Sequence, residues 1–356
     1  MTDTVAAATR VSSQRIEAFI ARALEAVSVP RDDAASIAEL MTRADLNGAD
    51  GHGVFRLPQY IRRIKAGAVN VKPIIRIERE APGMALVDGD NGMGHLVMRF
   101  AADTAIEKAQ TAGVAWVGVK RSNHAGPASL YASMPIAHNM IGLYLAVGNA
   151  NHLAAWGGLD MLLSTNPIAV GVPAGDEPPI VLDMATTVAA YGKVKTAAQR
   201  GETMPEGWMI DRQGQPLTDP KRANEGLLLP IGGYKGYGLA LVFGLLAGTL
   251  NGAAMGRDVV DFNNDDTTPT NTGHVIVAIN IAKFRALADF KRSVDELIRD
   301  LRGSKRLPGV DAIRLPGEQS HAKREARMKH GIPLPAPLLS SLNQLAAELK
   351  IGALSY

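Results

Sequence analysis

The chain has 356 residues, of which 46% are hydrophobic and 21% are charged, a composition typical of a globular protein with two or three domains. Its 38 basic and 35 acidic residues leave a formal net charge of +3, and no dense run of lysine and arginine interleaved with aromatic residues occurs, which argues against a nucleic-acid partner. The chain has no cysteine, which excludes disulfides, thiolate metal sites and a cysteine nucleophile and fits a reducing cytoplasm.

The apolar segments predict neither a secretory signal nor a membrane span. The N-terminus lacks the apolar core of a signal peptide, and we expect the first ten or so residues to be loose. The longest apolar run, LALVFGLLAGTL at 239–250, is too short and too rich in glycine to cross a bilayer. We therefore expect a soluble, cytoplasmic protein without membrane contact.

The first quarter of the chain is predicted to be helical. Apolar residues recur at helical spacing between Ser12 and Pro30, namely Ile16, Phe19, Ile20, Leu24 and Val27. A second helix is expected with Asp32 or Asp33 as its N-cap and an end near Gly48. A short basic helix over 59–67 and strands over 69–80 and 84–90 follow.

The middle of the chain alternates helices with apolar strands, which is typical of an α/β protein. A helix is expected over 95–113 and a strand buried on both faces over 114–120. The other predicted elements are strands at 141–147, 168–173, 179–185 and 275–280, a helix at 236–250, and C-terminal helices at 294–301 and 337–350. Helical ends around a mixed sheet predict a discontinuous helical domain, 1–75 joined in space by 310–356, with a sheet domain inserted at 76–309.

Four loops, three of which contain glycine, concentrate polar residues beside apolar elements: DGHGVFR (50–56), SNHAGPAS (122–129), STNPIA (164–169) and GGYKGYG (232–238). Two of them carry histidines, His52 and His124, whose neutral rings can exchange a proton near physiological pH. Arg56 offers a planar fork for a carboxylate and would lie one helical turn from His52. A solvent-facing turn for His52, and a surface or inter-subunit ion pair for Arg56, remain open alternatives.

The usual nucleotide-binding motifs are absent. Neither G-x-G-x-x-G after a strand nor G-x-x-x-x-G-K-S/T occurs. The segment 124–128 nevertheless follows a buried strand and is expected to open the next helix, whose free N–H groups would attract an anion. Lys235 and Gly236 likewise place a cation and a glycine at a helix start, although an ordinary glycine-rich loop is an alternative there.

No metal site is predicted. The segment DFNNDDTT at 261–268 lacks the glycine and the distal glutamate of an EF-hand, which favours a solvated turn. Five further histidines show no metal-ligand spacing, namely His95, His138, His274, His321 and His330.

Taken together, the loops resemble the malate/L-lactate dehydrogenase family, which is unrelated to Rossmann-type lactate dehydrogenases. That family includes ureidoglycolate dehydrogenase, sulfolactate dehydrogenase and Δ1-piperideine-2-carboxylate reductase. The resemblance runs from about Ile16 to Gly352. Its matched stretches are ADLNGADGHGVFRLPQY, SNHAGPASLYA, WGGLDMLLSTNPIAV, VLDMATTVAAYGK, PEGWMIDRQGQPLTDP, GGYKGYGLAL, LPGEQSH and HGIPLP.

The resemblance implies an NAD(P)-dependent oxidoreductase with the family's own non-Rossmann cofactor-binding fold, usually a homodimer. His52 is similar to the acid/base histidine, His124 to a second proton-transfer or nicotinamide-contacting histidine, and Arg56 to the substrate-carboxylate binder. Tyr60 and Thr165 resemble further substrate contacts. The residues that resemble the NAD or NADP site are His124, Ala125, Gly126, Pro127, Ala128, Asp183, Met184, Ala185, Lys235, Gly236, Gly317, Glu318 and Gln319.

Two positions depart from the family pattern. Gly51 stands where relatives commonly carry serine, which leaves the identity of the substrate open. Lys193 stands where the imine reductases carry an aspartate, which argues for oxidation of a 2-hydroxy acid or reduction of a 2-oxo acid. Reduction of a cyclic imino acid is the alternative activity, and a catalytically degenerate binding homologue is a third, weaker one.

Overall fold

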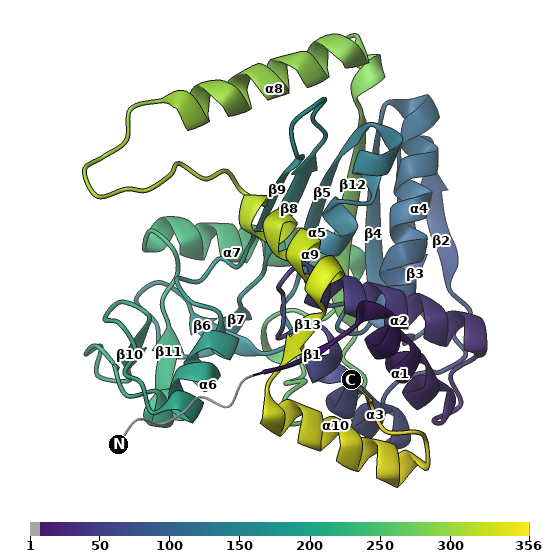
Figure 1. Cartoon of the computed structure of the whole chain (residues 1–356), viewed down its shortest axis with the longest axis vertical. Coiled ribbons are helices and arrows are strands. Elements are labelled where there is room, and N and C mark those ends of the chain that lie inside the picture. The colour runs from purple at the N-terminus through teal and green to yellow at the C-terminus, as the bar shows by residue number, and fades with distance from the viewer. Residues whose placement is uncertain (1–7, 356) are drawn as a thin grey trace.

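The computed structural model describes residues 8–355, apart from the side chains of residues 199 and 200. The loose N-terminal segment expected from the sequence therefore lies almost entirely outside the described residues. Figure 1 shows a central sheet flanked by helices, with most of the N-terminal helices gathered below it.

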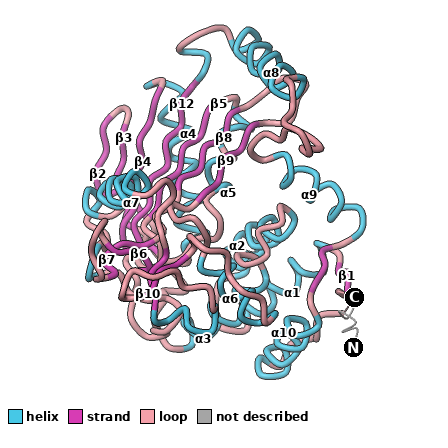
Figure 2. The backbone as a smooth tube through the Cα atoms, turned by 90° about the vertical axis from the view of Figure 1, so that its left-hand side faces the viewer, coloured by secondary structure: helices cyan, strands magenta, loops and turns pink. Residues whose placement is uncertain are grey.

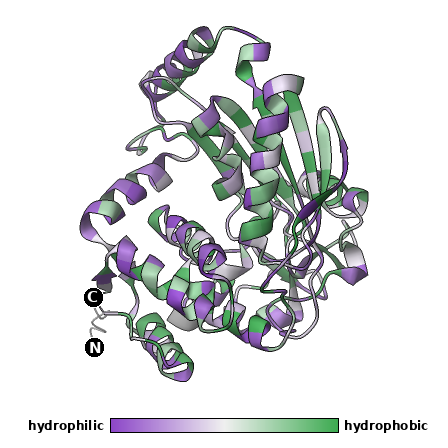
Figure 3. Cartoon of the chain, turned by 90° about the vertical axis from the view of Figure 1, so that its right-hand side faces the viewer, coloured by the Kyte–Doolittle hydropathy of each residue, from purple (hydrophilic) through white to green (hydrophobic). Residues whose placement is uncertain are grey.

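The sheet is mixed, as the sequence predicted, and its strand order is β2-β3-β4-β12-β5-β8-β9. Only β3 and β4 pair in parallel, and all other neighbours are antiparallel. The strands, in sheet order, are Arg76–Ala81, Met84–Asp88, Val114–Ser122, Thr272–Asn280, Met140–Ala146, Ile168–Val172 and Ile180–Met184. Helix α4 (Gly94–Ala112) makes the crossover between the two parallel strands and packs its alanine-rich face on them. Figure 3 shows how hydrophobic the strands are where this packing occurs.

Four helices and a short strand pair build the region around both ends of the described chain. The helices are α1 (Ser13–Glu25), α2 (Arg31–Leu46), α3 (Leu57–Lys65) and α10 (Ala336–Leu349). Strand β1 (Thr9–Val11) pairs antiparallel with β13 (Ile332–Leu334), so the start of the described chain lies beside its C-terminal region (Figure 2). Apolar residues of all these elements share one buried cluster.

The N-cap predicted for the second helix is wrong. The cap is Pro30, whose extended backbone precedes Arg31 and whose carbonyl accepts the Ala34 N–H at 2.8 Å. Asp32 and Asp33 lie inside the first turn instead, where negative charge favours the helix dipole. The predicted strand over 69–80 is also too long, because Pro73 cannot donate to a ladder and β2 begins only at Arg76.

Several elements were not predicted. They are the hairpins β6 (Asn151–Ala154) with β7 (Met161–Ser164) and β10 (Met209–Asp211) with β11 (Gly226–Leu228), and the helices α6 (Tyr191–Arg200) and α9 (Glu318–His330). Two predicted helices have different bounds, α7 (Tyr234–Ala247) and α8 (Leu287–Gly303). Figure 1 shows α8 at the upper edge of the molecule, joined to α9 by a long connection. Between residues 8 and 355, none of the helices has the length and apolarity that crossing a bilayer requires.

Candidate active site

The loop that carries His52 is anchored by a buried carboxyl group at the end of α2. Asp45 accepts the backbone N–H of Val54 at 2.8 Å and is almost fully buried. This burial raises the pKa of Asp45 to about 8, against the opposing effect of the Val54 hydrogen bond. A Cβ atom at Gly53 would lie only 1.9 Å from Oδ1 of Asp45. The second glycine of DGHGVFR is therefore required by the close approach of the carboxyl group.

We expect Gly53→Ala to lower the free energy of unfolding by about 1–3 kcal/mol, the usual cost of overpacking a filled site. Gly51→Ala is the matched control, because no atom of the described structure lies within 4 Å of a Cβ at Gly51 and its φ is not positive. Urea denaturation of both variants checks the pair. Equal stability of the two would contradict the account of the loop.

Three of the predicted site residues meet in one cluster of rings. The rings of His52 and His124 are nearly parallel with centroids 5.6 Å apart, and Phe262 also stacks on His124, with centroids 5.1 Å apart. The hydroxyl of Tyr60 lies 2.6 Å from Nδ1 of His124. The chain thus brings together His52, Tyr60 and His124 from two loops and helix α3.

The hydrogen bonds of His124 define its tautomer. The backbone N–H of Gly126, which can only donate, points to Nδ1 of His124 at 3.4 Å, so Nδ1 is an acceptor. Burial raises the pKa of Tyr60, and its retained hydroxyl proton is donated to the same nitrogen. The neutral His124 ring therefore carries its proton on Nε2, where it is a hydrogen-bond donor.

His52 differs from His124 in having no such restraint. Its side chain is partly exposed, and among the described residues neither ring nitrogen has a hydrogen-bond partner. Desolvation and then the positive charge of Arg56 lower the pKa of His52 to about 4. The ring is therefore neutral at physiological pH and free to accept a proton.

Arg56 is held by neutral groups. Its Nε donates to the carbonyl of Gly51 at 2.9 Å, and Nη1 donates to Oε1 of Gln59 at 2.7 Å and to Oδ1 of Asn263 at 3.4 Å. Gln59 is fixed in turn by the carbonyl of Phe262 at 2.6 Å. Throughout the described range no carboxylate forms an ion pair with Arg56. The guanidinium is thus oriented while its charge remains available to an external anion.

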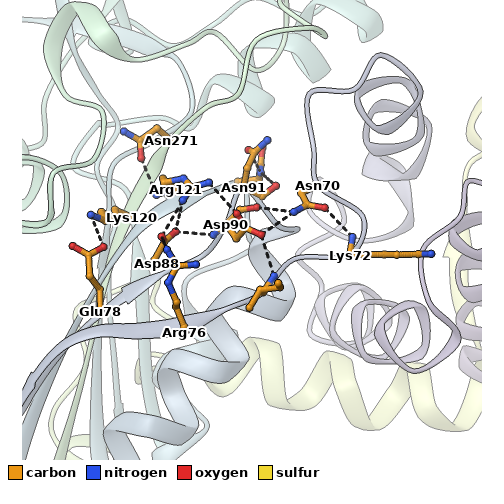
Figure 4. Close-up of polar contacts among 12 residues, drawn as sticks. Asn70, Lys72, Arg76, Glu78, Asp88, Asp90, Asn91, Lys120, Arg121 and Asn271 are labelled. Carbon is orange, nitrogen blue, oxygen red and sulfur yellow. Dashed lines mark hydrogen bonds and ion pairs between the residues drawn. The ribbon is translucent and has the colours of Figure 1, made fainter.

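A charged network fixes the end of β4, from which His124 projects. Asp88 is buried and accepts from Arg76 at 2.8 Å and from Arg121 at 2.9 Å, while Arg121 also reaches Asp90 at 2.9 Å (Figure 4). Asn123, adjacent to His124, donates to the backbone of the same loop at Asn91 and Gly92. The position of His124 is therefore set by the junction of β3 and β4.

Two groups at the site were missed by sequence reasoning. His95 is fully buried edge-on to Tyr60, with ring centroids 5.6 Å apart, and has no partner for either ring nitrogen within the described residues. Its isolated position in α4 gives no sequence signal. The segment 261–268 is not simply a solvated turn, because Phe262 is buried on His124 and Asn263 contacts Arg56. The only sequence signal for a buried contact was the apolar residue Phe262 within this polar segment.

The helix that the segment 124–128 was expected to open is only one turn long. The segment 124–128 is not followed by a long helix but by the single turn α5 (Ser129–Ala132), and Pro135 lacks the N–H that would continue it. The N–H of Ser129 donates to Oδ2 of Asp183 at 2.8 Å. That contact places the segment 124–128 beside the predicted cofactor residues 183–185.

The C-terminal candidates lie beside the same strand, β9. The N–H of Val181 donates to the carbonyl of Pro316 at 3.0 Å, and Gly317 has a φ of 94° with its Cβ position 3.0 Å from the Val181 nitrogen. Glu318 is paired with Arg302 of α8, and Gln319 is exposed. Residues 317–319 thus lie beside the same strand, β9, as the predicted cofactor residues 124–128 and 183–185.

Thr165, Lys235 and Gly236 belong to a neighbouring set of loops. The N–H of Thr186 donates to the carbonyl of Thr165 at 2.9 Å, and the N–H of Ile231 donates to the carbonyl of Thr186 at 3.0 Å. A Cβ at Gly236 would lie 2.1 Å from the Ile231 carbonyl oxygen, so this turn needs glycine. Lys235 lies in the first turn of α7 and has no ion-pair partner in the part of the chain that the structure describes.

These residues fit a dinucleotide. The first N–H groups of α7 and the unpaired Lys235 form a donor set suited to phosphate, and Gly232 and Gly233 precede them with positive φ. The unpartnered ring of buried His95 lies against Gly126, whose Cβ would be 3.3 Å from Nε2. Among residues 8–355, no group of three or more His, Asp or Glu side chains is placed to hold a metal ion.

Both the sequence and the fold match known proteins. The model of the malate/L-lactate dehydrogenase family matches residues 11–343. Malate dehydrogenase of Pyrococcus horikoshii is 37% identical over 354 residues, covering 97% of each chain, and its solved structure has a TM-score of 0.89. The structure of sulfolactate dehydrogenase from Methanocaldococcus jannaschii has a TM-score of 0.90 at 35% identity, covering 97% of this chain and 98% of that one.

The chain is also similar to a solved reductase structure and to two relatives whose names state a cofactor. The structure of Δ1-piperideine-2-carboxylate reductase from Pseudomonas syringae has a TM-score of 0.84 at 30% identity, covering 95% of this chain and all of that one. Two relatives, each 31% identical, carry a cofactor in their names: ureidoglycolate dehydrogenase (NAD(+)) of Escherichia coli and (2R)-3-sulfolactate dehydrogenase (NADP(+)) of Chromohalobacter salexigens. They cover 91% and 95% of this chain and 92% and 98% of their own lengths.

Proposed function

This chain belongs to the malate/L-lactate dehydrogenase family, and we propose that it transfers a hydride between NAD or NADP and C2 of a small 2-hydroxy or 2-oxo acid. The observation that carries the proposal is the pairing of an unrestrained neutral histidine, His52, with an oriented but uncompensated guanidinium, Arg56. A carboxylate holder beside a proton-transfer group is what interconversion of a hydroxy acid and an oxo acid requires.

Each residue of the site has a distinct task in this reaction. Arg56 binds the substrate carboxylate, and His52 takes the proton from the C2 hydroxyl during oxidation or returns it during reduction. His124, held by Tyr60, donates from Nε2 to the same oxygen. A carboxylate bound at Arg56 also offsets the charge that lowers the pKa of His52, so this pKa rises and more of the ring carries the proton that reduction requires. The bound nicotinamide supplies or accepts the hydride.

Turnover with a panel of acids tests this function. The protein is expected to oxidise NADH or NADPH in the presence of 2-oxo acids and to act poorly on cyclic imino acids, because Lys193 stands where imine reductases carry an acidic residue. Turnover confined to cyclic imines would establish the alternative activity. If NADH stabilises the protein but no compound in the panel is turned over, the chain is a homologue that binds the cofactor without catalysis.

Lys235→Ala is expected to weaken binding of NADH and NADPH, because it removes the unpaired cation from the first turn of α7. The loss should be about 10-fold or more, as for other hydrogen bonds to charged groups. Fluorescence titration of both cofactors measures it. Lys221→Ala, which removes an exposed lysine from the 3-10 helix Pro220–Glu225, is the control. Unchanged affinity in Lys235→Ala would place the phosphates elsewhere.

We also propose that the protein is a homodimer formed through α7 and α8. Beyond its first turn helix α7 is apolar on every face, yet Leu239, Val242 and Leu245 are 42%, 49% and 44% exposed. The end of α8 and the connection after it line an open hollow of about 810 Å³ and expose further leucines. Light scattering is expected to give twice the mass of one chain for the wild type. For Val242→Asp it should give the mass of a single chain. A monomeric wild type would refute this assembly.

We propose that residues 1–75 and 310–356 form one helical domain, into which the sheet domain 76–309 is inserted. In support, β1 pairs with β13, and α1, α3 and α10 share a buried cluster. Hydrogen exchange is expected to show the two helical segments losing protection together and separately from the sheet. Loss of protection in a single step for the whole chain would argue against two domains.

A cytoplasmic location is proposed as well. The chain has no cysteine, which suits a reducing compartment. Cell fractionation of the native host tests the location. Recovery of the protein outside the cytoplasm would overturn the proposal.

A further inference from the structure

The loop around His52 is tied to a distant part of the chain by a residue that the reaction described above does not use. Arg327, in the last turn of α9, donates from Nη1 to the backbone carbonyl of Asp45 and to Oδ1 of Asp50. Its Nη2 donates to Oδ2 of Asp50 at 3.2 Å, which completes a bidentate pair. The side chain of Arg327 is only 11% exposed. One guanidinium therefore joins the end of α2 to the residue that opens DGHGVFR.

This loop depends on hydrogen bonds because packing does not hold it. Among residues 8–355, no atom lies within 4 Å of a Cβ position at Gly51, and glycine leaves the backbone free to adopt several conformations. The N–H of His52 donates to the carbonyl of Ala49 at 2.8 Å. The carbonyl of Gly51 accepts from Nε of Arg56 at 2.9 Å. Both of these contacts are local, whereas Arg327 reaches the loop from the C-terminal region.

Helix α9 is attached through polar side chains at both of its ends. None of its residues is fully buried, so apolar packing contributes little to its position. At its start, Glu318 pairs with Arg302 of α8. Near its end, the stem of Lys323 lies against Gly48, where a Cβ would be 2.6 Å from Cδ of the lysine. The last turns of α9 and the loop that follows α2 are therefore held against each other by Lys323 and Arg327.

We propose that Arg327 is a positioning residue for the proton transfer. By holding Asp50 and the carbonyl of Asp45, it fixes the backbone on which the His52 ring is carried. The ring then stays stacked against His124, with centroids 5.6 Å apart, and within reach of the reacting oxygen. Arg327 acts through the loop, because its Nη1 and Nη2 donate to Asp45 and Asp50. The inference rests on the proposed function, in which His52 exchanges the proton.

Arg327→Gln is expected to lower kcat for a 2-oxo acid about 10-fold to 100-fold, because displacing a proton-transfer group slows the reaction. Affinity for NADH, measured by fluorescence titration, should change by less than about 2-fold, since Glu318 keeps its pair with Arg302. Arg327→Lys should recover part of the rate, because an ammonium can still pair with Asp50 but not in a bidentate way. Lys329→Gln, at an exposed position in the same turn, is the control and should leave kcat unchanged.

A double-mutant cycle with His52→Ala distinguishes positioning from a merely structural role. If Arg327 acts through His52, adding Arg327→Gln to His52→Ala should lower kcat by less than about 2-fold further. Asp50→Asn, whose side chain is 62% exposed, gives a second variant in which folding is preserved. It should show the same non-additivity with a smaller loss, because the amide oxygen still accepts one hydrogen bond. Equal fold losses in the two backgrounds would refute the positioning role.

The outcomes separate this inference from the function on which it rests. If the wild type reduces 2-oxo acids and Arg327→Gln leaves kcat unchanged, or lowers kcat and NADH affinity in step, the positioning role is refuted and the function stands. If His52→Ala itself leaves kcat unchanged, Arg327 cannot act through His52, and the inference fails while hydride transfer stands. If the wild type binds NADH yet reduces no 2-oxo acid, the proposed function fails and the inference fails with it.

Discussion

His52→Ala is expected to lower kcat roughly 10²-fold to 10⁴-fold, the usual contribution of a positioned acid/base group. Affinity for NADH or NADPH should stay nearly intact, because the ring of His52 stacks on His124 and lies outside the proposed phosphate-binding set. Since His52 is partly exposed, added imidazole should restore part of the rate. Steady-state kinetics at saturating cofactor measure all three effects.

The matched comparison is His124→Ala. His124 is fixed as a donor by Tyr60 and Gly126, so its loss should also slow turnover, but imidazole should restore little because the partners of Nδ1 would be left unpaired. Near-wild-type turnover in His52→Ala together with collapse in His124→Ala would transfer the acid/base role to His124. His52 would then be a wall of the pocket.

Arg56→Ala should reduce kcat/KM about 10-fold to 150-fold, because a hydrogen bond to a charged group contributes about 1.5–3 kcal/mol. Arg56→Lys should recover only part of this, since an ammonium cannot reproduce the bidentate geometry of a guanidinium. Some loss of kcat is also expected where the substrate is misplaced.

Arg62→Ala is the control for Arg56. Arg62 lies on helix α3, whose N-cap is Arg56; its side chain is 56% exposed and pairs with Asp266 at 3.1 Å. Its removal should leave kcat/KM within about 2-fold, as exposed ion pairs contribute little. Equal effects of the two substitutions would show that Arg56 contributes only general positive charge.

The elements with regular apolar spacing were predictable from the sequence, and those without it were not. Helix α1 buries Ile16, Phe19, Ile20 and Leu24, as its pattern predicted. Helix α9 buries none of its residues, so EQSHAKREARMKH carries no apolar period to detect. The short hairpins β6–β7 and β10–β11 depend on long-range packing rather than on local alternation.

The candidate site shows the same limit. The glycines and the polar residues around His52 and His124 identified two loops, but nothing local indicated that Phe262 would stack on His124 or that His95 would lie beneath Tyr60. Such contacts join segments up to about two hundred residues apart, and they arise only when α3, α4 and the segment 261–268 pack together. Sequence reasoning therefore identified His52 and His124 as candidates and missed Phe262 and His95, which pack around them.

The most direct test of the central claim follows the hydride itself. A 2-oxo acid that the protein turns over is reduced with NADH or NADPH carrying deuterium in both C4 positions of the nicotinamide, and the product is analysed by NMR. The account predicts a 2-hydroxy acid with deuterium on C2, formed stoichiometrically with the oxidised cofactor. A product with only solvent hydrogen on C2, or cofactor oxidation without any 2-hydroxy acid, would contradict it.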